Sequence, residues 1–361
     1  MKVKKSDFEP IINVTRNDIV ENIHFGSYCI TGKDGQLLYS YGNEKRIIYS
    51  RSTAKPFQAL SVVLSGAYEK YKLTSKELAV ISSSHFAEKD HIDQVKSILS
   101  KIGFNEEDLL TPFVYSRNEK IKEKQLLEGE KARKIFSDCS GKHAGMLAVC
   151  KLKGYPIENY INIEHPLQKE IIRLISIIYA TEDLKVGVDG CSAPVFAASM
   201  ESLANSYLSL ITCKLNERQR LLAKKYDYNY NDIEFALKII RNAILENPEM
   251  IAGNDGLCTL LISIYGGSCI AKVGASGVYC LGLNDFVTKH SIGIAVKISD
   301  GSIPAAEFAL MSILYRLNVL PSTRSNYINS ILFKKNLNEH KNEVGKYIFL
   351  DDELPSLANL I

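Results

Sequence analysis

The apolar residues of this 361-residue chain are spaced as in strands at both ends and as in helices between them. In the first 50 residues the turn-prone segment 31–35 separates strand-like segments at 27–30 and 37–40, which predicts a β-hairpin. From about residue 53 to 255 the period is helical. The two periods favour an α+β fold.

The chain has no internal repeat, and its expected elements follow in order. The expected helices of the middle part are 53–66, 74–82, 88–102, 141–153, 166–180, 195–212 and 232–246. Strand character returns at 268–272, 277–283 and 293–298, before a final helix at about 303–318.

The early and late strands are expected to pair into one antiparallel sheet flanked by helices. We therefore assign residues 1–70 and 260–361 to this sheet layer. A mainly helical subdomain, residues 71–259, is inserted into it, and the two form a single compact catalytic unit.

Composition excludes several classes of protein. The 44 basic and 41 acidic residues leave a net charge of only +3, spread evenly, so no nucleic-acid partner is expected. The charge-rich segment 118–134 fits a solvated loop and helix face. The eight cysteines stand singly, without a CxxC pair, and should be mostly reduced.

Neither a targeting segment nor a membrane span is expected. The positively charged first ten residues have no apolar run behind them, so we expect no signal peptide. The longest uncharged stretch, 256–271, is interrupted by two glycines and is shorter than the roughly 20 residues that span a bilayer. The default location is the cytoplasm.

The segment Arg51-Ser-Thr-Ala-Lys-Pro56 contains Ser-x-x-Lys where a helix should begin. Pro56 belongs in a first turn, which puts Ser52 near the helix N-terminus with Lys55 on the same face. A serine hydroxyl needs a base to become a nucleophile, and a lysine with a lowered pKa can supply one. Alone, Ser52 fits a plain helix cap equally well.

Chain order favours the catalytic interpretation. Penicillin-recognising serine enzymes carry Ser-x-x-Lys, then a serine-containing element, then Lys-Thr-Gly on a late strand. Here Ser82-Ser-Ser-His85 closes a helix and Lys272-Val-Gly274 lies on an expected strand. Without these companions, Lys272 would fit an ordinary edge-strand lysine.

A second group of residues places cysteines in glycine-containing loops. Asp138-Cys-Ser-Gly-Lys-His-Ala-Gly145 and Asp189-Gly-Cys-Ser-Ala-Pro194 each precede an apolar segment expected to be helical. Two thiolates supply half of a tetrahedral zinc site. Inert loop cysteines, or a cysteine nucleophile paired with His143, are alternatives that the spacing leaves open.

With these blocks, the chain resembles the asparaginase II family, the serine-lysine, zinc-binding class 3 of L-asparaginases. The resemblance runs from 19–24 through 293–301. Its most specific blocks are 51–56, 83–85, 139–145 and 189–194. It implies a fold similar to serine β-lactamases and penicillin-binding proteins, and a homodimer.

The resemblance also implies roles for single residues, all carried over from the family's motif. Ser52 would be the acylated nucleophile beside Lys55, and Ser84 with Lys272 would form a second serine-lysine pair. The implied ligands of one zinc ion (Zn²⁺) per chain are Cys139, Lys142 and Cys191. The implied substrate-binding residues are Arg51, His143 and Asp189, of which Asp189 would suit a substrate α-ammonium.

The chain departs from the family at two positions. Phe25 and Gly256 stand where family members often have arginine. Because the positions implied to be catalytic are intact, we expect an L-asparaginase that hydrolyses a small amino-acid substrate through a serine acyl-enzyme. The alternatives are a penicillin-recognising serine hydrolase and a catalytically weak metabolite-binding protein.

Overall fold

A computed structural model describes residues 7–361 of the chain. Residues 1–6, the start of the segment in which no signal peptide is expected, lie outside the described residues. The chain divides into two units. The first contains the described part of Met1–Thr53, with Ala198–Thr212 and Ile264–Ile361, and the second contains Ala54–Ala197 and Cys213–Ser263.

This division differs from the expected layers at three places, of which the smallest is 260–263, expected in the sheet layer but part of the second unit. Residues 54–70 belong to the second, helical unit, whereas we expected them in the sheet layer. Residues 198–212 belong to the first unit, because most of them form the helix Met200–Thr212, which packs directly on its sheet. Sequence periodicity gives the type of an element but not the neighbours that it packs against.

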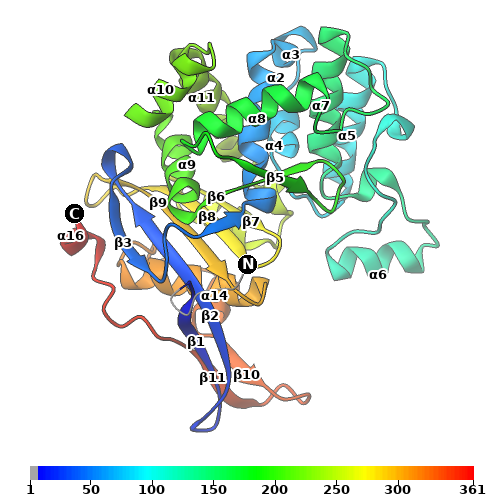
Figure 1. The fold of residues 1–361 in the computed structure, drawn as a ribbon. Coiled ribbons are helices and arrows are strands. Elements are labelled where there is room, and N and C mark those ends of the chain that lie inside the picture. Colours follow the sequence, from blue (N-terminus) through cyan, green and yellow to red (C-terminus); the bar gives the residue numbers. More distant parts are fainter. Residues whose placement is uncertain (1–6) are drawn as a thin grey trace. The chain divides into compact units, whose positions relative to one another are not determined.

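The first unit is built on an antiparallel sheet with the order β10-β11-β1-β2-β9-β8-β7, in which β3 also pairs with β2 (Figure 1). Its strands are β1 (Glu9–Arg16), β2 (Ile19–Thr31), β3 (Leu37–Tyr41), β7 (Cys269–Gly274), β8 (Val278–Asn284), β9 (Ser291–Ile298), β10 (Lys335–Leu337) and β11 (Glu343–Phe349). The unit also contains η1 (Lys33–Gly35), the short strand β4 (Ile47–Tyr49), α9 (Met200–Thr212), α14 (Ile303–Arg316), α15 (Asn326–Leu332) and α16 (Leu357–Leu360).

Two expectations about this sheet are confirmed. Strand β2 pairs with β3 to make the expected hairpin around the turn at 31–35. Strand β2 also pairs with β9, which joins the early strands to the late ones in one sheet. The α+β class with an antiparallel sheet follows from this pairing.

Helix α9 packs against β8 and β9, and α14 also packs on this sheet. The backbone of α9 approaches the sheet closely at two paired glycines, Gly282 and Gly293. A Cβ at Gly293 would lie 2.0 Å from the carbonyl oxygen of Ala204. Only glycine therefore allows this approach of helix and strand.

The second unit is mainly helical. Its elements are α1 (Lys55–Gln58), α2 (Leu60–Leu64), α3 (Ala67–Lys70), α4 (Ser75–Ile81), α5 (Lys89–Ile102), η3 (Glu106–Asp108), α6 (Glu119–Leu127), η4 (Lys134–Phe136), α7 (Ser140–Lys153), α8 (Pro166–Ile178), α10 (Glu217–Lys225), α11 (Tyr230–Glu246), α12 (Glu249–Ala252) and α13 (Leu257–Ile264). These ranges confirm most of the expected helices, including those at 74–82, 88–102, 141–153 and 166–180.

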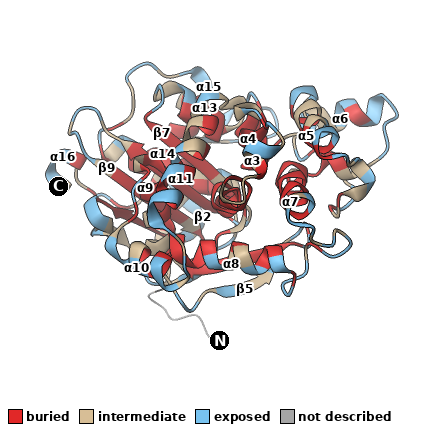
Figure 2. Ribbon diagram, turned by 90° about the horizontal axis from the view of Figure 1, so that it is seen from above, coloured by how far each residue is buried: buried red, intermediate tan, exposed pale blue. Residues whose placement is uncertain are grey.

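Eleven of the fourteen residues of helix α7 are buried, and Figure 2 shows most of its length in the colour of buried residues. It packs against α4 and α5. At Gly141 an added Cβ would lie 2.3 Å from the carbonyl oxygen of Val80, and at Gly145 it would lie 2.8 Å from Ile81. The two glycines let α7 lie directly on the C-terminal end of α4.

One expected helix is partly wrong. Residues 195–212 were expected to be helical throughout, but Pro194–Ser199 form the strand β6, which pairs with β5 (Lys185–Val188). Pro194 lacks an N–H, and a short apolar run such as Val195 to Ala198 fits a buried strand and a buried helix equally well. Pairing with β5 decides for the strand.

In the part of the chain that the structure describes, no helix is long and apolar enough to cross a bilayer.

We predict that Gly293→Ala lowers the free energy of unfolding by about 2 kcal/mol, because the new methyl group forces α9 away from the sheet. The control is Gly190→Ala, where no heavy atom lies within 4 Å of the added Cβ, and its change should stay within about 0.5 kcal/mol. Urea denaturation of both variants measures this. Equal stabilities would contradict the close packing of α9.

Candidate active site

The segment around Ser52 is fixed on the sheet of the first unit. Arg51 and Ser52 begin η2 (Arg51–Ala54), and Arg51 has a left-handed backbone with φ of 51°. A Cβ at Gly274, the end of β7, would lie 2.8 Å from the carbonyl oxygen of Ser50, so the strand and this segment are in close contact. The hydroxyl of Tyr207 on α9 donates to the carbonyl oxygen of Thr53 at 2.9 Å.

Ser52 and Lys272, both expected to be catalytic, lie in this first unit. Ser52 is 7% exposed and Lys272 is 1% exposed. Lys272 is on β7, two residues before Gly274, and its Nζ donates to the carbonyl oxygen of Val273 at 2.9 Å. The Arg51 guanidinium reaches the loop after β7, where it donates to Ser276 Oγ at 3.1 Å.

Lys55 lies in the second unit and begins α1, three residues after Ser52 along the chain. Its side chain is buried, and three acceptors surround its Nζ. It donates to Ser84 Oγ at 3.0 Å and to the carbonyl oxygen of Asp138 at 2.9 Å, and the Asp138 carboxylate lies 3.5 Å away. The structure therefore brings together Lys55 and Ser84, two residues that are 29 positions apart.

The three serines at the end of α4 have different roles. Ser82 Oγ donates to the carbonyl oxygen of Leu78, and Ser83 Oγ donates to that of Val80, so both hydroxyls satisfy the end of the helix. Only Ser84 turns its hydroxyl to Lys55, and its own N–H donates to the carbonyl oxygen of Ile251 at 3.1 Å. Ser84 is thus the one serine of the three placed for chemistry.

His85 holds the loop after Ser84 in place. Its Nδ1 accepts from the N–H of Ala87, so its Nε2 carries the proton and donates to Ser140 Oγ at 2.8 Å. Burial, together with the stacked His91 ring, keeps the pKa of His85 well below its usual value. A neutral imidazole therefore ties this loop to the first turn of α7.

Asp138 binds two cations. Its carboxylate accepts from the Arg117 guanidinium at 2.9 Å and lies 3.5 Å from Lys55 Nζ. Burial acts to raise the pKa of Asp138, but Lys55 and Arg117 together hold it well below its usual range. The carboxylate is therefore charged and fixes the position of the lysine amine.

Cys139, Lys142 and Cys191 form a second buried group, in the second unit. Cys139 and Lys142 lie on one face of the first turn of α7, and Cys191 lies in a tight turn closed by Asp189 and Ala193. Lys142 Nζ lies 3.2 Å from Cys191 Sγ, and the two cysteines share a hydrogen bond.

The three groups fix one another's charges. The hydrogen bond from Cys139 and the positive charge of Lys142 lower the pKa of the Cys191 thiol well below its usual value. The same hydrogen bond, together with burial, raises the pKa of Cys139. Burial favours a neutral Lys142 amine, yet the two sulfur atoms raise its pKa. The cluster thus contains one thiolate, one thiol and one ammonium group.

These donor atoms fit a zinc ion. Two sulfur atoms and one amine nitrogen converge in a buried place, and they would leave the fourth position of a tetrahedral site open. Among residues 7–361, no group of three or more His, Cys, Asp and Glu side chains could hold a metal. A metal site in this cluster therefore depends on the lysine nitrogen as its third ligand.

His143, the next residue on α7, is oriented by Tyr160. The Tyr160 hydroxyl accepts from the N–H of Leu110 and lies 2.8 Å from His143 Nδ1, so it donates to that nitrogen. The proton of the ring is then on Nε2, which is buried and lies near the Cys191 sulfur. His143 thus offers a donor to a ligand and is unsuited to bind a metal through this nitrogen.

The two positions that depart from the family have different surroundings. Phe25 lies on β2 and is 42% exposed. At Gly256 an added Cβ would lie 2.3 Å from the carbonyl oxygen of Ala252, so the backbone there leaves no space for an arginine.

Sequence reasoning gave no role to three residues of these clusters. Asp138 stands directly before Cys139, and its place in that block was the one available signal. Arg117 and Tyr160 make contacts to residues 17 or more positions away and carry no local pattern. The expected pairing of Ser84 with Lys272 involves one residue of each unit and stays a prediction.

The family model described as L-asparaginase II matches residues 12–349. No curated protein matches the sequence. Among solved structures, a probable glutaminase from Bacillus subtilis, complexed with 6-diazo-5-oxo-L-norleucine, is similar to this chain. The match covers 81% of this chain and 84% of the glutaminase chain, with 11% identity and a TM-score of 0.39. A Bacillus glutaminase in 4.3 M NaCl is also similar, over 81% of this chain and 91% of the glutaminase chain, with 11% identity and a TM-score of 0.37.

Proposed function

The chain belongs to the L-asparaginase II family and is an amidohydrolase, and we propose that it hydrolyses L-asparagine to L-aspartate and ammonia. The observation that carries the proposal is the buried hydrogen bond from Lys55 to Ser84. A lysine amine and a serine hydroxyl in contact, away from water, can pass a proton between them.

The reaction proceeds in two steps. The Ser52 hydroxyl attacks the carbon of the side-chain amide while a deprotonated lysine of the two serine-lysine pairs takes the hydroxyl proton. The tetrahedral intermediate collapses when the amide nitrogen receives a proton and leaves as ammonia. Water then attacks the ester on Ser52, and the hydroxyl regains its proton as aspartate leaves.

The other serine-lysine pair, Ser84 with Lys272, moves protons in this scheme. Asp138 orients Lys55 through its carboxylate and its backbone oxygen. Asp189 binds the substrate α-ammonium, Arg51 binds the α-carboxylate, and His143 donates to the substrate through Nε2. Each of these assignments is part of the proposal.

We also propose that Cys139, Lys142 and Cys191 hold one zinc ion per chain. The convergence of their three donor atoms supports this, as does the depressed pKa of Cys191, since a thiolate is the form that binds metal. When bound, zinc would supply a Lewis acid with one open position. Homodimer formation and a cytoplasmic location stay predictions of the sequence.

The roles of the serines give a first prediction. Ser52→Ala should lower kcat/KM for asparagine by more than about 10⁴-fold, because the nucleophile is lost. Ser84→Ala should lower it by about 10² or more, because a proton-transfer group is lost. Ser83→Ala is the matched control: it removes a helix-end hydrogen bond and should cost about 1 kcal/mol of stability while turnover is kept.

Ammonia release measures these rates, and urea denaturation measures the stabilities. Intact-mass analysis of a slowly deacylating variant should show the acyl group on Ser52. If Ser83→Ala and Ser84→Ala lowered turnover equally, the special position of Ser84 would have no catalytic meaning. If Ser52→Ala turned over asparagine as fast as the wild type, Ser52 would not be the nucleophile.

The zinc assignment gives a second prediction. Protein purified without chelator should contain about one zinc per chain, and Lys142→Met or Cys191→Ser should lower this to near zero. Cys150→Ala changes another buried cysteine of α7 and should leave the zinc content unchanged. Zinc affinity should fall as pH falls, because the ligands must lose protons to bind. Unchanged zinc in a Cys139→Ser, Cys191→Ser double variant would show that the metal is elsewhere or absent.

Substrate choice gives a third prediction. A site that grips both the α-ammonium and the α-carboxylate fixes the amide carbon at one distance from Ser52. Glutamine is one methylene longer, and a misplacement of about 1 Å can cost around 100-fold in rate. Asparagine should therefore exceed glutamine by at least that factor in kcat/KM, and benzylpenicillin should not acylate Ser52. Equal ammonia release from both amino acids would mean that the amidohydrolase is not specific for asparagine.

A further inference from the structure

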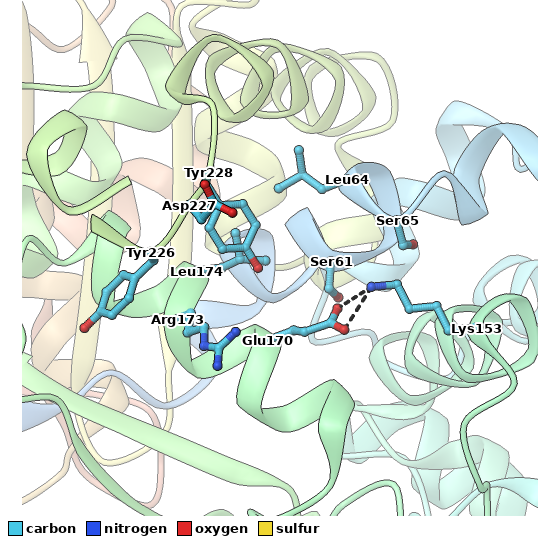
Figure 3. A pocket seen from close by; sticks show the side chains of 10 residues that line it. All are labelled: Ser61, Leu64, Ser65, Lys153, Glu170, Arg173, Leu174, Tyr226, Asp227 and Tyr228. Carbon is cyan, nitrogen blue, oxygen red and sulfur yellow. Dashed lines mark hydrogen bonds and ion pairs between the residues drawn. The ribbon is translucent and has the colours of Figure 1, made fainter. Parts of the chain in front are cut away.

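The second unit contains a pocket that shares no residue with the proposed catalytic and zinc groups. It lies among α2, the end of α7, α8 and the loop after α10 (Figure 3). Its volume is about 320 Å³. This is at the small end of the range of about 300 to 1,000 Å³ for small-molecule sites, so it suits a small metabolite.

Four charged side chains line this pocket, two of each sign: Lys153, Glu170, Arg173 and Asp227. Lys153 and Glu170 neutralise each other, with Nζ 2.8 and 2.9 Å from the two carboxylate oxygens. Glu170 also accepts from the Tyr155 hydroxyl at 2.7 Å. This pair is neutral and has little capacity left for a ligand.

Arg173 and Asp227 are differently placed. Arg173 follows Glu170 by one turn of α8, so both side chains extend from the same face of the helix into the pocket (Figure 3). Neither Arg173 nor Asp227 forms an ion pair or a side-chain hydrogen bond with any of residues 7–361, and they do not pair with each other. The pocket therefore offers one uncommitted cation and one uncommitted anion.

Tyr228 lies near Glu170 and Arg173. Burial is the main cause of the raised pKa of its hydroxyl; the Glu170 carboxylate raises it further, whereas Arg173 lowers it. The phenol is thus close enough to both groups to sense them. Leu64 and Leu174 add apolar surface to the lining, and the Ser61 hydroxyl is occupied by the carbonyl oxygen of Gln58.

The charges decide the class of ligand. A simple anion would be attracted by Arg173 but repelled by the uncompensated carboxylate of Asp227. A simple cation would be attracted by Asp227 but repelled by Arg173. A ligand with one carboxylate and one ammonium satisfies both. We propose that this pocket binds a free α-amino acid, with its carboxylate on Arg173, its ammonium on Asp227 and its side chain against Leu64 and Leu174.

This inference does not rest on the proposed function, and its test separates the two. The melting temperature of the protein is measured with each of the twenty protein amino acids at about 10 mM, because a ligand that binds only the folded state raises it. The chains are the wild type, Arg173→Gln, Asp227→Asn and Asp189→Asn. The matched control is Arg218→Gln, which makes the same change at an exposed arginine of α10 outside the pocket.

At least one amino acid should raise the melting temperature of the wild type, Arg218→Gln and Asp189→Asn, but not that of Arg173→Gln or Asp227→Asn. A shift that is lost only in Asp189→Asn belongs to the proposed catalytic site. If every shift survives in both pocket variants, or if no amino acid shifts the wild type, the pocket is not an amino-acid site.

Analogues of the best amino acid test the zwitterion directly. Its α-hydroxy acid lacks the ammonium and its methyl ester lacks the carboxylate, and we expect each to bind at least about 10-fold more weakly in calorimetric titrations, which is about 1.4 kcal/mol. Equal affinity for the hydroxy acid would make the pocket an anion site and overturn the proposal. Circular dichroism shows that the variants are folded.

Discussion

The candidate active site depends on how the amine of Lys55 is buried. A lysine without water must have hydrogen-bond acceptors around it, because an unpaired buried charge costs several kcal/mol. Here the acceptors come from Ser84, at the end of α4, and from Asp138, just before α7. The lysine thereby joins three segments that are far apart in sequence, and Arg117 donates a further hydrogen bond that holds the Asp138 carboxylate in place.

The cysteine-lysine group follows the same rule with softer atoms. A buried ammonium, that of Lys142, is compensated by the Cys191 thiolate, and Cys139 satisfies the sulfur with a hydrogen bond. The charges of the ammonium and the thiolate cancel without a metal ion. A metal ion that bound here would displace the protons of Cys139 and Lys142. Lys55 is held by the Asp138 carboxylate, and Lys142 is held by the Cys191 thiolate. In each case a residue at the start of α7, Asp138 or Cys139, takes part in the hydrogen bonding.

The sequence predicted much of the fold, because hydrophobic period is a local property. The β2–β3 hairpin and the helices at 89–102 and 140–153 were visible in it, whereas β6 was not, since a six-residue apolar strand has no distinctive period. Ser52 and Lys55 were found because they share one turn. Arg117 and Tyr160 were not, because their partners lie on other segments and only the tertiary structure brings them together. The ligand set came from family resemblance, which carries information that one chain's spacing does not.

The contact of Gly141 and Gly145 with α4 has a consequence for how this protein can evolve. The end of α4 presents Ser84, and the start of α7 presents Cys139 and Lys142, so the two glycines set the distance between a serine-lysine pair and a sulfur cluster. A side chain larger than hydrogen at Gly141 would meet the α4 backbone and move both groups at once, and one at Gly145 would displace the Ile81 side chain. The serine-lysine pair and the sulfur cluster therefore keep a fixed separation. A shift of α7 that changed the geometry of one group would also change the geometry of the other.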